Sequence, residues 1–360
     1  MKAAVCYAYD KPLVIEEINI DPPKTGEVKV RVVACAICHS DIHQIHGDWS
    51  AALPLVAGHE AAGVVEEVGP GVTGVQVGDH VVMSLLRACG RCFYCSKGDT
   101  HLCEGKFALQ TETRLHNQQG QPIFQSINTA AFAEHAVVDQ SQLVPIPKEI
   151  PLDSASLLAC GVITGLGAVI NTAQVGTGES VAVLGMGGVG LNSIQGAVLS
   201  GAHPIIALDL LDNKLQAARD FGATHTINLA QEGDPVAAVK ALTGGRGVDY
   251  AFVTVGSPKA VAQAITLLRK GGSLVLVGIP DDKATHPLLL AQTVWREQRV
   301  LSSSMGSTRL SVQVPQLVEL YRYGRLKLDE LISQRYPLEQ INEAIAAVER
   351  GEALRNVIVF

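Results

Sequence analysis

A short apolar strand, three glycines at fixed spacing and a helix form the feature that most constrains this fold. Val181–Leu184 is followed by Gly185, Gly187 and Gly190, and then by a stretch typical of a helix. In such a unit the first glycine permits a tight turn and the second lets the backbone approach a pyrophosphate, while the third lets helix and strand pack closely. Free N–H groups at the helix N-terminus also favour an anionic phosphate. The pattern predicts a dinucleotide-binding unit.

The sequence after this unit alternates predicted strands and helices, which is typical of βαβ units and a parallel sheet. Asp209 ends the strand Ile205–Asp209, about 20 residues past the glycines, where a carboxylate binds the adenosine ribose and repels a 2′-phosphate. This favours NAD over NADP. Further strands are expected at Asp249–Val255 and Ser273–Val277, and helices at Leu191–Ser200, Lys214–Phe221 and Val261–Leu268.

The two ends of the chain differ from this middle region. The first 150 or so residues alternate short β-branched runs with glycine-rich turns, as at Val28–Ala34, Ala62–Val68 and His80–Met83. After about Met305, two amphipathic helical stretches lead to a last strand, which we interpret as a return to the first domain. The expected organisation is an α/β protein: residues 1–161 and 305–360 form a discontinuous β-rich domain, and residues 162–304 form a Rossmann domain with a doubly wound parallel sheet. The predicted elements of the tail are Val314–Tyr323, Leu338–Arg350 and Asn356–Phe360, and Glu104–Asn128 is expected to be a long surface loop.

Composition narrows the function classes. A chain of 360 residues suggests two domains. The 28 Lys+Arg against 35 Asp+Glu give a net charge of −7, which argues against nucleic acid or an anionic membrane as partner. No signal peptide is evident, and no run approaches the roughly 20 apolar residues that span a bilayer. We therefore expect a cytoplasmic protein that acts on a small molecule.

Four cysteines lie in one short stretch, at Cys89, Cys92, Cys95 and Cys103. A large cytosolic enzyme keeps its thiols reduced, so clustered cysteines indicate metal ligands. Zinc prefers tetrahedral sulfur coordination, and a two-residue gap lets neighbouring cysteines converge on one ion. Because all four positions are then filled by protein, this zinc would be structural.

Cys38, His59 and Cys160 form a second, three-ligand set that leaves a fourth position open for water or substrate, as catalytic zinc sites do. A lone cysteine is more often a buried small hydrophobic residue. The surrounding segments decide between these readings, and they occur in this order: Ile37–Asp41, Gly58–Val65, Gly78–Asp79, the four cysteines and Leu158–Gly161. In their order and approximate spacing, from about Met1 to Phe360, they resemble the zinc-containing medium-chain alcohol dehydrogenases.

The resemblance implies a GroES-like catalytic domain with a structural zinc lobe, and two zinc ions per subunit. Cys38, His59 and Cys160 match the catalytic zinc ligands. Glu60 matches a carboxylate that can approach the metal during ligand exchange, and Asp41 matches the carboxylate that orients the zinc-bound imidazole.

The resemblance also implies a set of NAD contacts. His39 and Arg355 match positions at the pyrophosphate, and Lys214 matches a second ribose contact. The remaining matching positions are Thr164, Gly188, Val189, Val277 and Ile279, beside Gly185, Gly187, Gly190 and Asp209.

Zinc lowers the pKa of a bound alcohol, and the nicotinamide then accepts hydride. Ser40 and His43 match the family's relay that carries the proton to solvent, for which an imidazole is suited. The matching substrate pocket is largely apolar, which implies a primary or secondary alcohol with a hydrophobic substituent. Its residues are Ser40, Trp49, Leu85, Leu102, Ile279 and Met305.

Other readings stay open at this point. Glutathione-dependent formaldehyde oxidation is disfavoured, because the family's acidic residue near Trp49 and arginine near Phe107 are missing, but another thiol carrier remains open. A member that holds NAD permanently is also open. A zinc-free quinone reductase would lack both ligand sets, and a zinc-stabilised protein without turnover should lack the Ser40–His43 relay. We expect a homodimer joined through Leu288–Leu301, with a homotetramer as alternative.

Overall fold

The computed structural model describes residues 1–49 and 51–360, and these separate into two compact units. The first unit comprises Met1–Gly161 and Arg309–Phe360, and the second comprises Val162–Thr308. The chain re-enters the first unit at Arg309, slightly later than residue 305 expected from the sequence. The segment before Arg309 is held by the second unit: Asn171 Nδ2 donates to Gly306 O at 2.8 Å, and Thr308 Oγ1 donates to Ile163 O at 3.4 Å.

The first unit is built on two sheets. One sheet has the order β11-β7-β6-β4-β19-β18, with β10 also paired to β4, and the other has the order β2-β1-β5-β9-β8-β3. Strand β4 shows why the segment is a strand: its β-branched residues alternate with charged ones, and most of its side chains are buried. The strands are β1 Lys2–Cys6, β2 Val14–Glu17, β3 Asn19–Ile20, β4 Glu27–Ala36, β5 Leu55–Val56, β6 Glu60–Val68, β7 His80–Met83, β8 Leu115–His116, β9 Pro122–Gln125, β10 His135–Asp139, β11 Leu143–Ile146, β18 Ile332–Pro337 and β19 Arg355–Val359. The helices are α1 His39–His46, α2 Phe93–Lys97, α3 Leu152–Ser156, α10 Leu310–Arg322 and α11 Ile341–Glu349.

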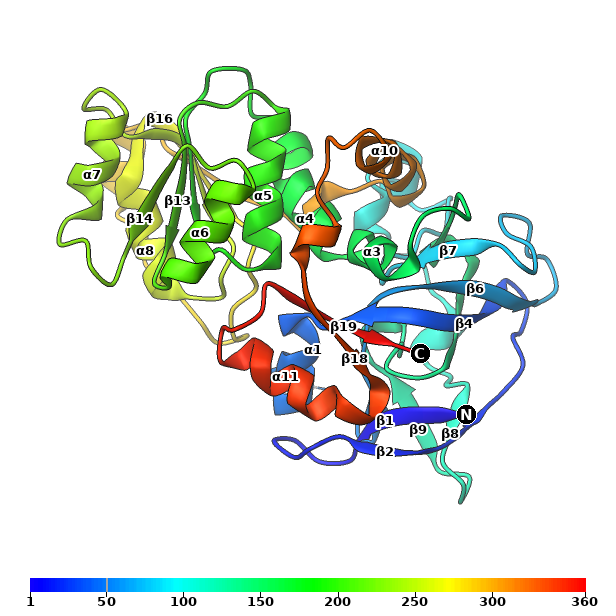
Figure 1. Cartoon of the computed structure of the whole chain (residues 1–360). Coiled ribbons are helices and arrows are strands. Elements are labelled where there is room, and N and C mark those ends of the chain that lie inside the picture. Colours follow the sequence, from blue (N-terminus) through cyan, green and yellow to red (C-terminus); the bar gives the residue numbers. More distant parts are fainter. Residues whose placement is uncertain (50) are drawn as a thin grey trace. The chain divides into compact units, whose positions relative to one another are not determined.

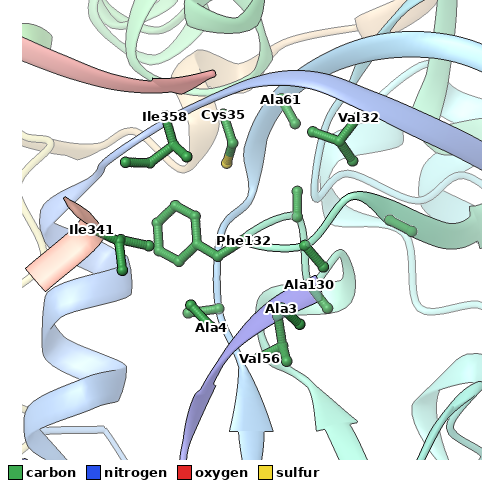
Figure 2. Packing of buried hydrophobic residues seen from close by; sticks show 14 of the residues in the cluster. Ala3, Ala4, Val32, Cys35, Val56, Ala61, Ala130, Phe132, Ile341 and Ile358 are labelled. Carbon is green, nitrogen blue, oxygen red and sulfur yellow. The ribbon is translucent and has the colours of Figure 1, made fainter. Parts of the chain in front are cut away.

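The core of the first unit contains residues from both of its chain segments. Phe132 is fully buried, and Figure 2 shows its ring near Ile341, Ile358 and Cys35. Ile341 begins α11 and Ile358 lies in β19, whereas Cys35 lies in β4. The C-terminal segment is therefore an integral part of this unit.

The second unit is a parallel sheet of order β14-β13-β12-β15-β16-β17. Its central strand β12 is buried along its whole length, as expected for a strand covered on both faces. Figure 1 shows α5 and α6 beside strands β13 and β14. The parallel sheet, with helices between its successive strands, confirms the predicted α/β class. The strands are β12 Val181–Leu184, β13 Ile205–Asp209, β14 His225–Asn228, β15 Val248–Val253, β16 Leu268–Leu276 and β17 Arg299–Ser302, and the helices are α4 Gly161–Gly167, α5 Gly188–Leu199, α6 Asp212–Asp220, α7 Pro235–Leu242, α8 Pro258–Leu267 and α9 Leu290–Trp295.

The segment Glu104–Asn128 is not the plain surface loop expected from its sequence. It contains the antiparallel pair β8 and β9, and Leu115 is fully buried. The guanidinium of Arg114 is also buried and pairs with Glu27 at 2.6 Å. The glutamine-rich composition concealed this, because the buried contacts of the segment are made with residues far away in the sequence.

The helices of both units are short, and the longest among the described residues, α10, has 13 residues. No single helix of the described residues is long and apolar enough to cross a membrane. One bent pair of helices, Leu152–Ala159 with Gly161–Ala173, is long and apolar enough by length and composition only.

Candidate active site and zinc centres

Three buried side chains of the first unit converge as a metal site. Cys38 ends the turn after β4, His59 directly precedes β6, and Cys160 precedes α4. Their ligand atoms all lie within 4.8 Å of one another. His59 Nε2 is buried without a hydrogen-bond partner among the described residues. Buried polar atoms are nearly always satisfied, so this nitrogen and the two sulfurs fit a metal ion.

Asp41 holds this site together from one side. Its Oδ1 accepts hydrogen bonds from His59 Nδ1 at 2.9 Å and from the Gly58 N–H at 2.8 Å. Its Oδ2 accepts from the Cys38 N–H at 3.1 Å. With Nδ1–H donated to Asp41, the Nε2 lone pair of His59 is directed at the two cysteines, which is how a carboxylate orients a metal-binding imidazole.

The electrostatics of the site favour an added cation. A hydrogen bond with Cys160 and the nearby charge of His59 lower the pKa of the Cys38 thiol well below its ordinary value, in spite of its burial. Burial alone would lower the pKa of His59, but the negative charges of Asp41 and Cys38 outweigh it and raise the pKa to about 10. The raised pKa of His59 shows that the negative charge around it favours a positive charge at Nε2, either a proton or, in its place, a divalent metal ion.

Glu60 forms an ion pair that the sequence did not predict. Its side chain is fully buried, pairs with the guanidinium of Arg355 and accepts a hydrogen bond from the Gly161 N–H. The register explains the pair, because Ala36 of β4 lies between Glu60 of β6 and Val357 of β19. The resemblance had placed Arg355 at the pyrophosphate; here its guanidinium is held by the carboxylate that follows His59.

Helix α1 presents the expected relay residues on successive turns. Ser40 is half-buried and His43 lies three residues later, on the same side of the helix. His43 Nδ1 lies 2.7 Å from Asp48 Oδ2, and the imidazole stacks on Trp49 with ring centroids 4.9 Å apart. The role of Asp48 was missed from the sequence. An acidic residue five positions after a candidate relay histidine was the available signal.

The remaining candidate pocket residues divide between the two units. Leu85 is half-buried and Leu102 is exposed, both in the first unit, while Ile279 and Met305 belong to the second. His39 is exposed at the first position of α1.

The four-cysteine lobe has the geometry of a zinc knuckle. The sulfur atoms of Cys89, Cys92, Cys95 and Cys103 all lie within 4.8 Å of one another. Backbone N–H groups point at the sulfurs: the Cys89 N–H donates to Cys103 Sγ at 3.2 Å, and the Cys92 N–H donates to Cys89 Sγ at 3.4 Å. A side chain at Gly105 would place its Cβ only 2.6 Å from Cys89 Cβ, so the chain needs glycine there.

The thiol pKa values of this lobe also call for a cation. The backbone N–H groups of Cys95 and Glu104 lower the pKa of Cys92 to about 6. Desolvation and the neighbouring sulfurs raise the pKa of Cys95 to about 12. The Cys92 thiolate therefore forms readily, whereas desolvation and the neighbouring sulfurs disfavour the Cys95 thiolate. The positive charge of a bound zinc ion would stabilise both thiolates.

The glycine loop of the second unit has the shape that a pyrophosphate requires. Gly185 has φ +97°, and a Cβ on it would lie 2.4 Å from Val255 Cγ1. A Cβ on Gly190 would lie 1.8 Å from Gly185 O, whereas nothing lies within 4 Å of one on Gly187. Gly187 caps α5. The loop thus leaves open space at its middle glycine and at the helix N-terminus, where Gly188 and Val189 begin α5.

Asp209 lies at the end of β13 beside this loop. Its Oδ2 accepts a hydrogen bond from the Met186 N–H at 2.6 Å, and its Oδ1 accepts from the Leu210 N–H at 2.7 Å. Lys214 is buried, which lowers its pKa, and the charge of Asp209 opposes that shift. Thr254 Oγ1 donates to Leu184 O and Gly185 O and so stabilises the start of the loop, a contact that the sequence did not predict. Thr164 and Val277 are both buried in this unit.

Comparison with known proteins agrees with this geometry. The sequence matches the family models for the alcohol dehydrogenase GroES-like domain over residues 24–148 and for the zinc-binding dehydrogenase over residues 188–322. It is 38% identical to S-(hydroxymethyl)glutathione dehydrogenase of Saccharomyces cerevisiae, over 99% of this chain and 95% of the relative. It is also 38% identical to the NDMA-dependent alcohol dehydrogenase of Amycolatopsis methanolica, over 99% and 98% of the two chains. The crystal structure of benzyl alcohol dehydrogenase from Acinetobacter calcoaceticus matches with a TM-score of 0.93 at 32% identity, over 100% of this chain and 99% of that one. The chain therefore belongs to the zinc-containing medium-chain alcohol dehydrogenase family, as its motifs predicted.

Proposed function

We propose that the protein transfers hydride between an alcohol and NAD at a zinc ion bound by Cys38, His59 and Cys160. The observation that supports this most directly is the buried, three-ligand site, which leaves one coordination position for substrate oxygen. Zinc bound there supplies Lewis-acid polarisation of that oxygen, and NAD supplies the hydride acceptor.

The protein's own residues perform the positioning. Asp41 fixes the imidazole tautomer of His59, so that Nε2 faces the metal position. Ser40 would accept the hydroxyl proton of the substrate while it donates its own proton to the nicotinamide ribose, and His43 would take the proton from that ribose and release it to solvent. Asp48, 2.7 Å from His43 Nδ1, holds that imidazole in place.

We propose NAD rather than NADP as the exchangeable cofactor. Asp209 already accepts two backbone hydrogen bonds, so its carboxylate is held at the end of β13, where the adenosine ribose would lie. A 2′-phosphate at that position would meet a negative charge. Lys214, beside Asp209, would supply the second ribose contact.

The substrate we propose is a primary or secondary alcohol with a hydrophobic substituent, because Trp49, Leu85, Leu102, Ile279 and Met305 are apolar. The similarity to S-(hydroxymethyl)glutathione dehydrogenase supports a thiol adduct as second candidate. Against a glutathione adduct, Trp49 and Phe107 stand where an acidic residue and an arginine would be needed.

The similarity to an NDMA-dependent alcohol dehydrogenase supports a further candidate, an enzyme that retains its nucleotide and uses an external electron acceptor. Measuring nucleotide in the supernatant after denaturing the purified, dialysed protein distinguishes the two modes. Freely exchanging NAD predicts none, and a retained cofactor predicts about one per chain.

We also propose a homodimer joined at the sheet edge β17, and a cytoplasmic location. Strand β17 is the outer strand of its sheet, and Leu289, Leu290 and Trp295 beside it are each more than two-thirds exposed. All eight cysteines are free, as ligand thiols in a reducing compartment must be. Light scattering after size exclusion tests the assembly: a particle of two 38.0 kDa chains is expected, four chains would show a tetramer, and a single chain would contradict pairing.

The reaction itself is tested by NADH formation with benzyl alcohol, a medium-length aliphatic alcohol and S-hydroxymethylglutathione in parallel. We expect the highest kcat/KM with one of the two alcohols. A glutathione adduct that exceeded both by tenfold or more would replace our substrate class with the second candidate.

A further inference from the structure

A cavity of about 700 Å³ in the second unit is lined by five cationic side chains. Lys240 lies in the last turn of α7 and Arg246 in the turn that leads to β15. Arg269 and Lys270 lie at the start of β16, and Arg296 directly follows α9. Segments far apart in the sequence thus bring five positive charges to one hollow.

This cavity is distinct from the dinucleotide loop. Its lining residues lie where β15 and β16 begin, whereas Gly185 and Asp209 lie where β12 and β13 end. In a parallel sheet all strands run the same way, so the starts and the ends of the strands lie on opposite sides of the sheet. The six residues of β15 correspond to a separation of roughly 20 Å at 3.3 Å per residue.

The positive charge of the cavity is only partly balanced by nearby carboxylates. None of the described residues that line it is a carboxylate. An adjoining cavity of about 340 Å³ shares Arg246 and Arg269 and adds Asp249, whose carboxylate already pairs with Arg269 at 2.6 Å and binds the Ser180 hydroxyl. The whole chain carries a net charge of −7, so the positive charge of this cluster is opposite in sign to that of the protein as a whole.

Ordinary structural roles account for only part of the cluster. Lys240 complements the C-terminal end of its helix, and Arg269 is the partner of Asp249. Arg246 and Lys270 are exposed and make no ion pair within the part of the chain that the structure describes. Arg296 donates to Leu268 O at 2.5 Å, but its buried Nε has no hydrogen-bond partner there. A buried donor without a partner, beside unbalanced cations, indicates that an anion completes the site.

We propose that this cavity binds a small polyphosphate, a chain of two or three phosphoryl groups. One guanidinium group can donate two parallel hydrogen bonds to two oxygens of a phosphate. The ammonium groups of Lys240 and Lys270 add further positive charge. The volume lies in the range of small-molecule sites. Among the described lining residues none is aromatic, so the site recognises the phosphate chain and not a nucleobase. This binding site is separate from the proposed hydride transfer.

The test is isothermal titration of the zinc-loaded enzyme with tripolyphosphate, pyrophosphate, phosphate and ATP, with excess NAD present to occupy the glycine loop. We expect one site per chain, with tripolyphosphate and ATP binding equally within about threefold and phosphate binding at least tenfold more weakly. Affinity should fall with added salt. Arg246→Glu and Lys270→Glu should each weaken tripolyphosphate binding at least tenfold.

Lys148→Glu is the matched control, since it reverses an exposed cation of the first unit and should leave the affinity within twofold. Melting curves show whether each variant is folded, and zinc analysis after titration shows whether the polyphosphate has only extracted zinc. The proposal would be overturned if all three variants bound tripolyphosphate equally, or if the heat followed the loss of zinc. Competition by NAD, or ATP binding tenfold more tightly than tripolyphosphate, would also overturn it.

Discussion

The carboxylate of Asp41 accepts a hydrogen bond from Nδ1 of His59 at 2.9 Å, and both side chains are fully buried. This contact decides which imidazole nitrogen faces Cys38 and Cys160. Because Asp41 also accepts the N–H groups of Cys38 and Gly58, one carboxylate positions the backbone next to two of the three candidate zinc ligands. The metal site therefore depends on a residue that does not itself bind metal.

Asp41→Asn should lower zinc affinity at the catalytic site by roughly 10- to 100-fold and reduce turnover in proportion, because the amide lacks the charge that fixes and polarises His59. Competition with a chelator of known affinity measures this. Asp48→Asn is the control: it removes a carboxylate from the same region, 2.7 Å from His43, and should keep zinc affinity within twofold of the parent. Equal zinc affinity in Asp41→Asn and the parent would contradict the positioning role.

The two cysteine sets should respond differently to substitution. Cys38→Ser should abolish turnover and leave one zinc per chain, with a melting temperature close to that of the parent. Cys95→Ser should instead lower the melting temperature, because the structural zinc contributes to folding. Zinc analysis and thermal melting on the two variants check this, and identical behaviour of the pair would contradict the assignment of roles.

Much of this organisation follows from local sequence. The strand–glycine–helix unit at Val181–Leu199 could be predicted because its strand, its three glycines and its helix follow one another directly in the sequence, whereas the distant contact of Thr254 with this loop could not. The convergence of Cys38, His59 and Cys160 was reached through resemblance, since nothing local links them. The Glu60–Arg355 pair was missed because only the pairing of β6, β4 and β19 brings those residues together. Arg114 was missed for the same reason, since its buried partner Glu27 lies in β4, far away in the sequence.

Replacing Asp209 with Gly should raise the kcat/KM ratio of NADP to NAD on the order of tenfold or more, because the charge that opposes a 2′-phosphate is removed. Initial rates with both cofactors give the ratio. Asp212→Ala, three residues further along, is the control and should leave the ratio unchanged. A parent enzyme that already prefers NADP would contradict the assignment of Asp209.

His46 should contribute stability that depends on pH. Its Nδ1 lies 2.5 Å from Asp10 and its Nε2 lies 2.6 Å from Glu349, so both nitrogens donate only when the ring is protonated. The hydrogen bond with Glu349, and then that with Asp10, raises the pKa of His46 against the effect of burial. The contribution is therefore fully present below about pH 6.5, the ordinary histidine value, and is lost as the pH rises through the higher pKa of the folded state.

His46→Gln should consequently destabilise the protein more at about pH 6 than at about pH 9, by roughly 1 kcal/mol or less because the site is partly exposed. Chemical denaturation at the two pH values measures the difference. Gln216→Ala is the control, since that neutral amide also donates to a carboxylate, Asp220 Oδ1 at 3.1 Å, and its effect should be the same at both pH values. A His46→Gln effect that is equal at both pH values would refute the paired-carboxylate account.

The most direct test of the central claim is NAD-linked alcohol turnover before and after zinc is removed by a strong chelator. We predict that turnover falls by at least about a thousandfold when the catalytic zinc is lost, and returns when zinc is restored to the Cys38–His59–Cys160 site. NAD-linked turnover that persists undiminished in protein shown by elemental analysis to be free of metal would contradict the account.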